Sequence, residues 1–313
     1  MSGVETQCPA CTNVSGVYED SHKSYSKYRC ASCDLVFFEP RRVEASFYEQ
    51  ADSYAFRHTG LDITRSYHQM FLSRNRCNRG QLLDIGCADG AFLEAAGGMG
   101  FDVYGIDWDR SSIQAAKEKR RLENVWGMSF ENFVQYAQKH NLKFDAITFF
   151  EVLEHTPDPH EFIRQVRGLL RENGCIAGSV PNRDRFAPYR EGSADYPPHH
   201  FTWWSRIVVT DFLSRHGLRD INVQLTPLQF NEAISYVAGQ CLGAYGSSVS
   251  GLIRRMLLGK SNISHIPVQH LSKHGSKGLL LKSIKFCRDA MFVIPTLLLL
   301  PKLREHIYFE ARC

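Results

Sequence analysis

The sequence lacks the features that mark membrane-spanning, secreted and repeat proteins. Its longest apolar run, Ala290 to Pro301, is about half of the roughly 20 residues that a spanning helix needs, and Pro295 interrupts it. The first residues, MSGVETQCPACTNV, contain no basic segment followed by an apolar stretch, so we expect no signal peptide. No segment repeats at the periods of solenoids or propellers. These absences favour a cytoplasmic protein.

An excess of one charge is also missing. Lys and Arg number 37 and Asp and Glu number 33, so the formal net charge is only +4 and by itself gives no argument for nucleic-acid binding. With 43% hydrophobic and 22% charged residues, the 313-residue chain has the composition of a globular protein of about two domains. In a reducing cytosol the ten cysteines are not expected to form a disulfide framework.

Four of the cysteines are concentrated near the N-terminus, as Cys8-x-x-Cys11 and Cys30-x-x-Cys33. Each CxxC turn can present two thiolates to one metal ion, and two such turns complete a tetrahedral site without an open position. The spacing therefore predicts a zinc ribbon over residues 1–42 with a structural Zn²⁺. A redox CxxC is the alternative, but it would not need a second copy. The other six cysteines, Cys175 among them, are expected to be ordinary small apolar residues.

From residue 81 onward, short apolar runs alternate with helical patterns. The runs include QLLDIG, VYGID, FDAITFF and CIAGSV, and the segments between them include SSIQAAKEKRR and PHEFIRQVRGLL. This alternation predicts an α/β domain with a doubly wound, mostly parallel sheet and helices on both faces. Ligands of such sheets bind at the carboxyl ends of the strands, so the loops there are the candidate site.

The first of these loops, residues 84–90 (DIGCADG), joins a strand to a helix and carries two acids, Asp84 and Asp89. It matches neither the dinucleotide fingerprint nor the P-loop. A pyrophosphate would meet like charge there, whereas a cationic ligand would not. About 20 residues later the second strand ends in Asp107, which can accept hydrogen bonds from both ribose hydroxyls. Together these acids predict an adenosine-like ligand with an amine or sulfonium, such as S-adenosylmethionine (SAM).

Three segments, LLDIGCADGAFLEAA, VYGIDWD and FDAITFFEVLEHTPDP, resemble the motifs of class I SAM-dependent methyltransferases. Within that superfamily the sequence is similar to the branch of the ubiquinone and menaquinone methyltransferases and of many sugar and small-molecule methyltransferases. The resemblance covers roughly residues 81–226. It implies a seven-stranded Rossmann-like sheet, with a core and helical lead-in over residues 43–226 and the last strand over residues 306–313.

The resemblance also implies which residues surround SAM: Asp84, Gly86, Cys87, Gly90, Asp107, Trp108, Ser129, Phe130, Phe150 and Glu151. Asp84 and the two glycines would shape the methionine end, and Asp107 would hold the ribose. Ser129 and Phe130 match the positions that flank the adenine, although this sequence lacks the commoner acidic residue there. Phe150 and Glu151 would line the methionine moiety, with core packing as the alternative for Phe150.

Three histidines are candidates for the chemistry, because a base must take the proton of a hydroxyl acceptor and histidine suits that role near neutral pH. His155 lies in EVLEH, and His199 and His200 lie in DYPPHHF. In similar enzymes the position of His155 faces the transferred methyl group, with loop ordering as the alternative. Adjacent side chains of an extended segment point to opposite faces. We therefore expect His199 to be the base and His200 to be structural. Tyr189 and Tyr196 are candidate acceptor contacts.

Residues 227–305 separate the last two predicted strands and form a basic insertion. From residue 230 to residue 305, ten Lys and Arg against three acids give a charge of +7. The segment GLLLKSIKFCRDAMFVIPTLLLLPKL is both basic and apolar. The sequence leaves three interpretations open: a helical cap over the active site, peripheral contact of residues 273–304 with the inner face of an anionic membrane, or a homodimer contact.

These features predict a SAM-dependent methyltransferase that acts on a hydroxyl of a small molecule or sugar. A zinc ribbon before such a domain resembles enzymes of surface-polysaccharide or natural-product biosynthesis, so a lipid-linked glycan or natural-product intermediate is a candidate acceptor. An RNA methyltransferase is the alternative. The ribbon is not markedly basic, and EVLEH stands where many base N-methylases have Asn/Asp-Pro-Pro-Tyr/Phe, which disfavours nucleic acid. A non-catalytic SAM-binding module is the third hypothesis, and the intact SAM motifs argue against it.

Overall fold

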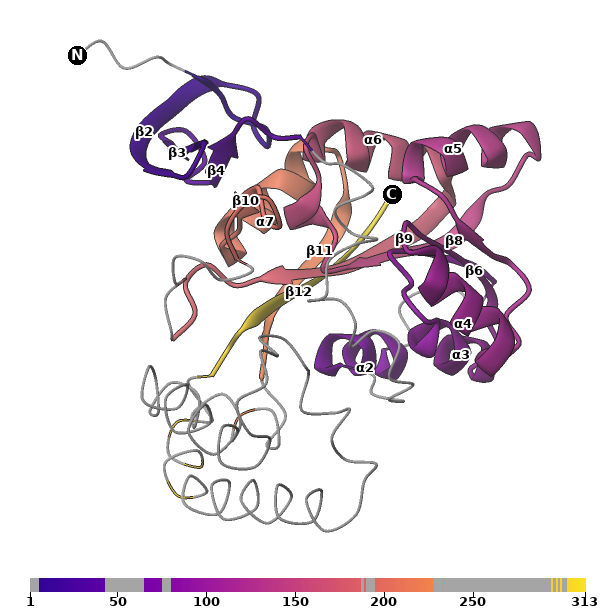
Figure 1. Cartoon of the computed structure of the whole chain (residues 1–313). Helices are drawn as coiled ribbons and strands as arrows, with labels where there is room; N and C mark the ends of the chain where they lie inside the picture. The colour runs from indigo at the N-terminus through magenta and orange to yellow at the C-terminus, as the bar shows by residue number, and fades with distance from the viewer. Residues whose placement is uncertain are drawn as a thin grey trace, which may run out of the picture. The chain divides into compact units, whose positions relative to one another are not determined.

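The computed structural model describes residues 6–42, 65–74, 80–186, 189, 195–227, 233, 294, 297, 299 and 303–313. The chain divides into a compact unit of Met1–Thr226 with Glu305–Cys313 and a second unit of Pro227–Arg304. The first unit contains a seven-stranded sheet and a five-stranded sheet (Figure 1). Apart from single residues, the three interpretations of the insertion concern a segment outside the described residues.

The large sheet has the strand order β11-β12-β9-β8-β5-β6-β7. Its strands are β5 (Gln81–Ile85), β6 (Asp102–Asp107), β7 (Val125–Gly127), β8 (Phe144–Phe150), β9 (Leu170–Pro181), β11 (Arg219–Thr226) and β12 (His306–Arg312). The first five pair in parallel, and β12 lies antiparallel between β9 and β11. The predicted doubly wound seven-stranded sheet is confirmed. Its central strands are continuous apolar runs because helices cover both of their faces.

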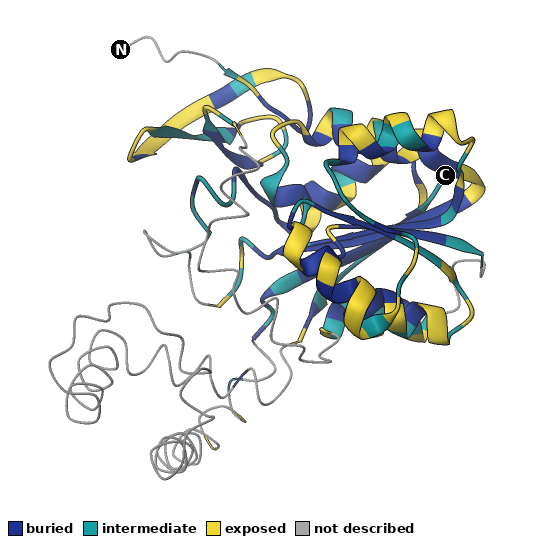
Figure 2. Cartoon of the chain, turned by 45° about the vertical axis from the view of Figure 1, so that its right-hand side comes forward, coloured by how far each residue is buried: buried dark blue, intermediate teal, exposed yellow. Residues whose placement is uncertain are grey.

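Helices form two layers on this sheet. They are α2 (Ser66–Ser73), α3 (Ala91–Gly98), α4 (Arg110–Arg120), α5 (Phe130–Lys139), α6 (Pro159–Leu169) and α7 (Arg206–Arg215). Figure 1 shows α5, α6 and α7 on one face and α2, α3 and α4 on the other. Asp109, Ser129, Asp158 and Ser205 cap α4, α5, α6 and α7, since each side chain accepts a hydrogen bond from a first-turn N–H. Figure 2 shows buried strands between helices whose outer faces are exposed.

The small sheet combines the N-terminal ribbon with a strand from much later in the chain. It consists of β1 (Thr6–Gln7), β2 (Val14–His22), β3 (Tyr25–Cys30), β4 (Val36–Glu39) and β10 (Thr202–Trp203), in that order. In the antiparallel β4–β10 pair, Thr202 stands opposite Phe37. The main-chain N–H of Phe38 also donates to the Phe201 carbonyl at 2.9 Å. The sequence did not predict this strand, which links the ribbon to the segment after His200.

One expectation about the cysteines was wrong. Cys175 of β9, expected to be an ordinary small apolar residue, is disulfide-bonded. Its side chain is buried, as a small apolar residue would be. The connectivity of disulfides cannot be deduced from a single sequence, so the spacing of Cys175 gave no signal of this bond.

The first prediction concerns Gly105 of β6, which lies beneath the loop after β5. A Cβ atom there would stand 2.5 Å from Leu93 Cδ1 and 2.8 Å from Cys87 Sγ. Such overpacking costs about 1–3 kcal/mol. Gly105→Ala should therefore lower the urea midpoint of unfolding and, by displacing Cys87, weaken ligand binding at the loop.

The matched control is Gly98→Ala at the exposed end of α3, where a Cβ meets nothing within 4 Å. This change should stabilise the protein by up to about 1 kcal/mol, because alanine has the higher helix propensity. Equal midpoints for wild type and Gly105→Ala would contradict the assignment of a tight contact.

Candidate active site

The loop between β5 and α3 follows a path that requires glycine. Gly86 and Gly90 have φ angles of 80° and 78°, in the left-handed region. A Cβ at Gly86 would also lie 2.7 Å from Val152 Cγ2, just beyond β8. The N–H groups of Gly86 and Cys87 donate to the Ile106 carbonyl at 2.8 and 3.0 Å. The loop backbone is thus held against the ends of both β6 and β8.

Asp107, at the end of β6, ties this loop to the next one. Its side chain is only 6% exposed. Oδ2 accepts a hydrogen bond from the Ala88 N–H at 2.9 Å, and Oδ1 accepts one from the Asp109 N–H at 2.8 Å. Each carboxylate oxygen can accept a second hydrogen bond. The arrangement therefore suits a ligand diol, with half-buried Trp108 as the next residue along the chain.

Asp84, at the end of β5, is a second buried acid. It is 4% exposed, and the Thr148 hydroxyl donates to its Oδ1 at 2.6 Å. Burial, reinforced by the nearby charge of Asp107, raises the pKa of Asp84 to about 8. Because like charges destabilise each other, a cationic ligand near these two acids would be stabilised by both.

The predicted adenine-flanking residues have structural contacts of their own. The Ser129 hydroxyl caps α5 by accepting a hydrogen bond from the Asn132 N–H at 3.2 Å. The buried Phe130 ring packs against Phe162, with 5.0 Å between centroids. Adenine contacts from this position would therefore come from first-turn N–H groups of α5, which have no acceptor inside the helix.

The end of β8 combines a core aromatic with a strained acid. Phe150 is buried and packs against Tyr67 and Phe92, with centroids 5.4 and 5.1 Å apart, as in the core-packing alternative. Glu151 has a φ of 54°, which is uncommon outside glycine and clusters at functional sites. Its Oε1 accepts a hydrogen bond from the Ser179 hydroxyl at 2.7 Å.

The segment after β8 brings together Glu154, His155 and His200. Leu153–His155 form a short 3₁₀ helix, η2. Glu154 Oε1 lies 3.8 Å from His155 Nε2 and 4.0 Å from His200 Nε2. The two imidazole centroids are 4.7 Å apart. Sequence reasoning did not include Glu154 among the site residues, although its place in EVLEH, beside a candidate histidine, was a usable signal.

The three histidines occupy different environments. His155 Nδ1 lies 2.6 Å from the His199 carbonyl oxygen, and because a carbonyl only accepts, Nδ1 carries the hydrogen. Burial lowers the pKa of His200 well below its ordinary value, with nearby positive groups adding to the effect. Burial, and secondarily the Lys23 ammonium, also lower the pKa of His199. His199 and His200 are therefore neutral at pH 7, the form in which imidazole accepts a proton.

The two candidate acceptor tyrosines lie where β10 joins the ribbon. Tyr196 packs against Trp203 and His22, with centroids 5.0 and 4.7 Å apart. Tyr189 packs against Trp203 at 4.4 Å and beneath the Arg185 guanidinium at 4.2 Å. These contacts show structural roles for both rings.

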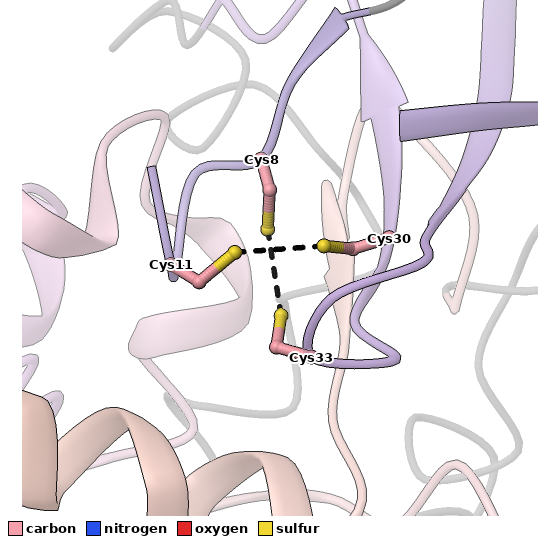
Figure 3. A group of neighbouring side chains, drawn as sticks. All are labelled: Cys8, Cys11, Cys30 and Cys33. Atoms are coloured by element: carbon pink, nitrogen blue, oxygen red, sulfur yellow. Dashed lines mark hydrogen bonds between the residues drawn. The ribbon is translucent and has the colours of Figure 1, made fainter. Parts of the chain in front are cut away.

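The four N-terminal cysteines converge, and Figure 3 shows their sulfur atoms facing one another. The Cys8 and Cys33 sulfurs are 3.6 Å apart, and those of Cys11 and Cys30 are 3.5 Å apart. Zinc–sulfur bonds of about 2.3 Å in a tetrahedron place sulfurs about 3.8 Å apart. The donor set and its spacing therefore fit one Zn²⁺ ion.

A separate cavity lies at the amino-terminal end of β9, away from these loops. Basic residues dominate its lining, among them Arg164, Arg167, Arg171 and Arg215. Arg164, Arg171 and Arg215 form ion pairs with Glu161, Asp145 and Asp211, and Arg167 donates to the His216 carbonyl. Because these charges are already engaged within the chain, the cavity is not a candidate for the methyl acceptor.

Comparison with known proteins agrees with this geometry. A family model described as a methyltransferase domain matches residues 56–231. Ubiquinone biosynthesis O-methyltransferases from Glaesserella parasuis and Histophilus somni are 35% and 37% identical over 108 and 112 residues, 33% of this chain in each case. The chain spans about half the length of these relatives, 46% and 45%.

Solved structures share the fold. Phosphoethanolamine N-methyltransferase 2 from Haemonchus contortus, in complex with SAM, superposes with a TM-score of 0.52 at 13% identity, covering 88% of this chain and 62% of that one. The strand order, the glycine loop and the two acids after β5 and β6 define a class I SAM-dependent methyltransferase. The chain belongs to the methyltransferase-domain family. No helix in the described part of the chain has the length and apolar character of a membrane span.

The second prediction concerns Asp84. Its pKa is about 8 in the folded protein and about 3.9 in an unfolded chain, so the folded state binds more protons between these values. The free energy of unfolding of the ligand-free protein should therefore fall as pH rises from about 4 to about 8. Asp84→Asn, which stays neutral, should remove this loss.

The measurement is the thermal midpoint of wild type and Asp84→Asn at several pH values. The difference between variant and wild type should grow with pH up to about 8 and then level off. A constant difference would contradict the raised pKa.

Proposed function

We propose that this methyltransferase transfers the methyl group of SAM to a hydroxyl of a small molecule or sugar, with histidine as the general base. Two observations support the proposal. His199 and His200, which are neutral at pH 7, lie in the loop after β9, and the curated relatives are named O-methyltransferases. A lipid-linked glycan or natural-product intermediate is our candidate acceptor class.

Some residues of the chain would bind SAM, and others would act on the methyl acceptor. Bound SAM would supply a methyl group on a positively charged sulfur. Asp107 would accept hydrogen bonds from the ribose, and Asp84 would be held in its ionised form by the positive charge of the ligand. The glycine loop would let the backbone approach the methionine end. On the acceptor side, an imidazole nitrogen of His199 would take the hydroxyl proton.

The third prediction tests this assignment by S-adenosylhomocysteine release from a panel of nucleotide sugars, lipid-linked sugars, phenols and RNA. His199→Ala should lower kcat by about 10²–10⁴-fold, the usual contribution of a general base. Its SAM affinity should stay at the wild-type value. The control is His140→Ala, an exposed histidine at the end of α5, which should not change turnover.

Turnover on RNA alone would contradict the proposed acceptor class. If His199→Ala turned over at the wild-type rate, the general base would be a group other than His199. Bound SAM without turnover on any member of the panel would favour the non-catalytic module.

We also propose that the ribbon binds one structural Zn²⁺ through Cys8, Cys11, Cys30 and Cys33. The sulfur separations support this assignment. The Cys33 thiol, as hydrogen-bond donor, lowers the pKa of Cys8 to about 5, so the metal-free cluster already favours a thiolate. Four thiolates leave no open position, and the ion would therefore stabilise the ribbon without taking part in methyl transfer.

The fourth prediction is that native mass spectrometry finds a zinc ion that Cys33→Ser removes and Cys313→Ser does not. Cys313 is the matched control, because it is a half-buried free thiol outside the cluster. Since β4 of the ribbon pairs with β10 beside His200, Cys33→Ser should impair methyl transfer more than SAM binding. Unchanged zinc content in Cys33→Ser would contradict the ligand assignment.

A further inference from the structure

The Glu154 carboxyl group is buried, and its oxygen atoms have no hydrogen-bond partner among the described residues. Its side chain is 1% exposed. Burial, reinforced by the nearby charges of Glu151 and Asp195, raises the pKa of Glu154 well above its ordinary value. Without a cation the site therefore favours the neutral carboxyl, whereas a cation at its oxygens would stabilise the ionised form.

Backbone contacts hold this carboxylate in place. The main-chain carbonyl of Glu154 accepts a hydrogen bond from the Phe201 N–H at 2.9 Å. This bond joins η2 to the segment that carries His200. The position of Glu154 is thus set by the same contact that positions its histidine neighbour.

The two histidines present nitrogen atoms to the same place. Since His155 Nδ1 carries the hydrogen toward the His199 carbonyl, Nε2 is the ring nitrogen that can coordinate an ion. A carbonyl behind a histidine fixes the ring and its tautomer in this way at many metal sites. His200 Nε2 lies 4.0 Å from the same Glu154 oxygen, and its Nδ1 lies 3.9 Å from Asp195 Oδ1.

The separations are too long for direct hydrogen bonds and fit a shared ion. Glu154 Oε1 is 3.8 and 4.0 Å from the two Nε2 atoms, and the ligand atoms of all three residues lie within 4.8 Å of one another. In a tetrahedral site, metal–nitrogen and metal–oxygen bonds of about 2.0–2.2 Å place two ligand atoms about 3.4 Å apart. Side-chain shifts of about 1 Å would bring all three atoms to that separation.

We propose that Glu154, His155 and His200 bind one divalent transition-metal ion at the acceptor side of the site, distinct from the ribbon zinc. Two imidazoles and one carboxylate are a donor set suited to Zn²⁺, Fe²⁺, Mn²⁺ or Co²⁺. Three protein ligands leave positions open, as in catalytic sites, and an acceptor oxygen fits there. Ion binding is independent of the proposed function, whereas its catalytic consequence rests on it.

The proposed consequence divides the three histidines by role. A hydroxyl bound to the ion loses its proton more readily, because the ion stabilises the negative oxygen. The proton passes to His199, the oxygen forms a bond to the methyl carbon, and the sulfur–methyl bond breaks with its electron pair kept by sulfur. The products are a methyl ether and S-adenosylhomocysteine, and the ion is neither oxidised nor reduced.

The fifth prediction tests the ion site with Co²⁺ added to the full chain already loaded with zinc. One equivalent of Co²⁺ should bind and give visible bands without the intense charge-transfer band of a thiolate site, while the ribbon zinc is retained. Glu154→Gln keeps the shape but loses the charge, and it should weaken Co²⁺ binding by at least about 100-fold, since even residues behind metal ligands contribute about 10–100-fold. His200→Gln should do the same.

Glu161→Gln is the matched control, the same change at a carboxylate on the outer side of α6 that pairs with Arg164, and it should bind Co²⁺ as the wild type does. Zinc content and circular dichroism report whether each variant folds. Absence of bound Co²⁺ in the wild type, a thiolate-type spectrum, or equal binding by a folded Glu154→Gln would overturn the proposal. Co²⁺ binding without methyl transfer to any acceptor would leave the ion site standing and contradict only the proposed function.

Discussion

The burial of acids at the carboxyl end of a parallel sheet is the constraint on which the site depends. Asp84, Asp107 and Glu154 are each less than a tenth exposed. Charged groups removed from water need opposite charge or hydrogen bonds, and the chain supplies these unequally. Asp107 accepts two backbone N–H groups, Asp84 accepts one hydroxyl, and neither oxygen of Glu154 has a partner among the described residues. Cationic ligands would complete what the fold leaves unsatisfied.

The sheet topology places buried acids together at the carboxyl end of the parallel strands. Asp84, Asp107 and Glu151 lie at or just past the ends of three strands that run in the same direction. Glu154 follows after three more residues, and the short helix η2 turns it back toward the loop after β9. Parallel pairing thereby brings residues that are far apart in sequence close together in space. Ligand sites of such sheets lie at the carboxyl ends of the strands for this reason.

The sequence predicted the parts that depend on local pattern. Apolar runs and the helical patterns between them marked the strands and helices of the large sheet, and the CxxC spacing marked four cysteines that the structure brings together. It did not predict what depends on distant contacts. Glu154 was not among the predicted site residues, because a glutamate in a polar loop is usually solvated. Only the three-dimensional structure shows that the loop after β9 covers it. The β4–β10 pairing also joins segments that no local pattern connects.

The ribbon contributes to the site through these distant contacts. Strand β10 begins two residues after His200 and pairs with β4, so the ribbon holds one end of the histidine loop. Two further links join the ribbon to loops of the core. Arg183 Nη2 pairs with Asp34 at 2.7 Å, and Arg41 Nε donates to the Pro157 carbonyl at 2.7 Å. Pro157 lies two residues after His155, and Arg183 lies two residues after β9. Both segments that carry the histidines therefore abut the ribbon, and a small domain with its own cysteine cluster becomes part of the framework that positions these histidines.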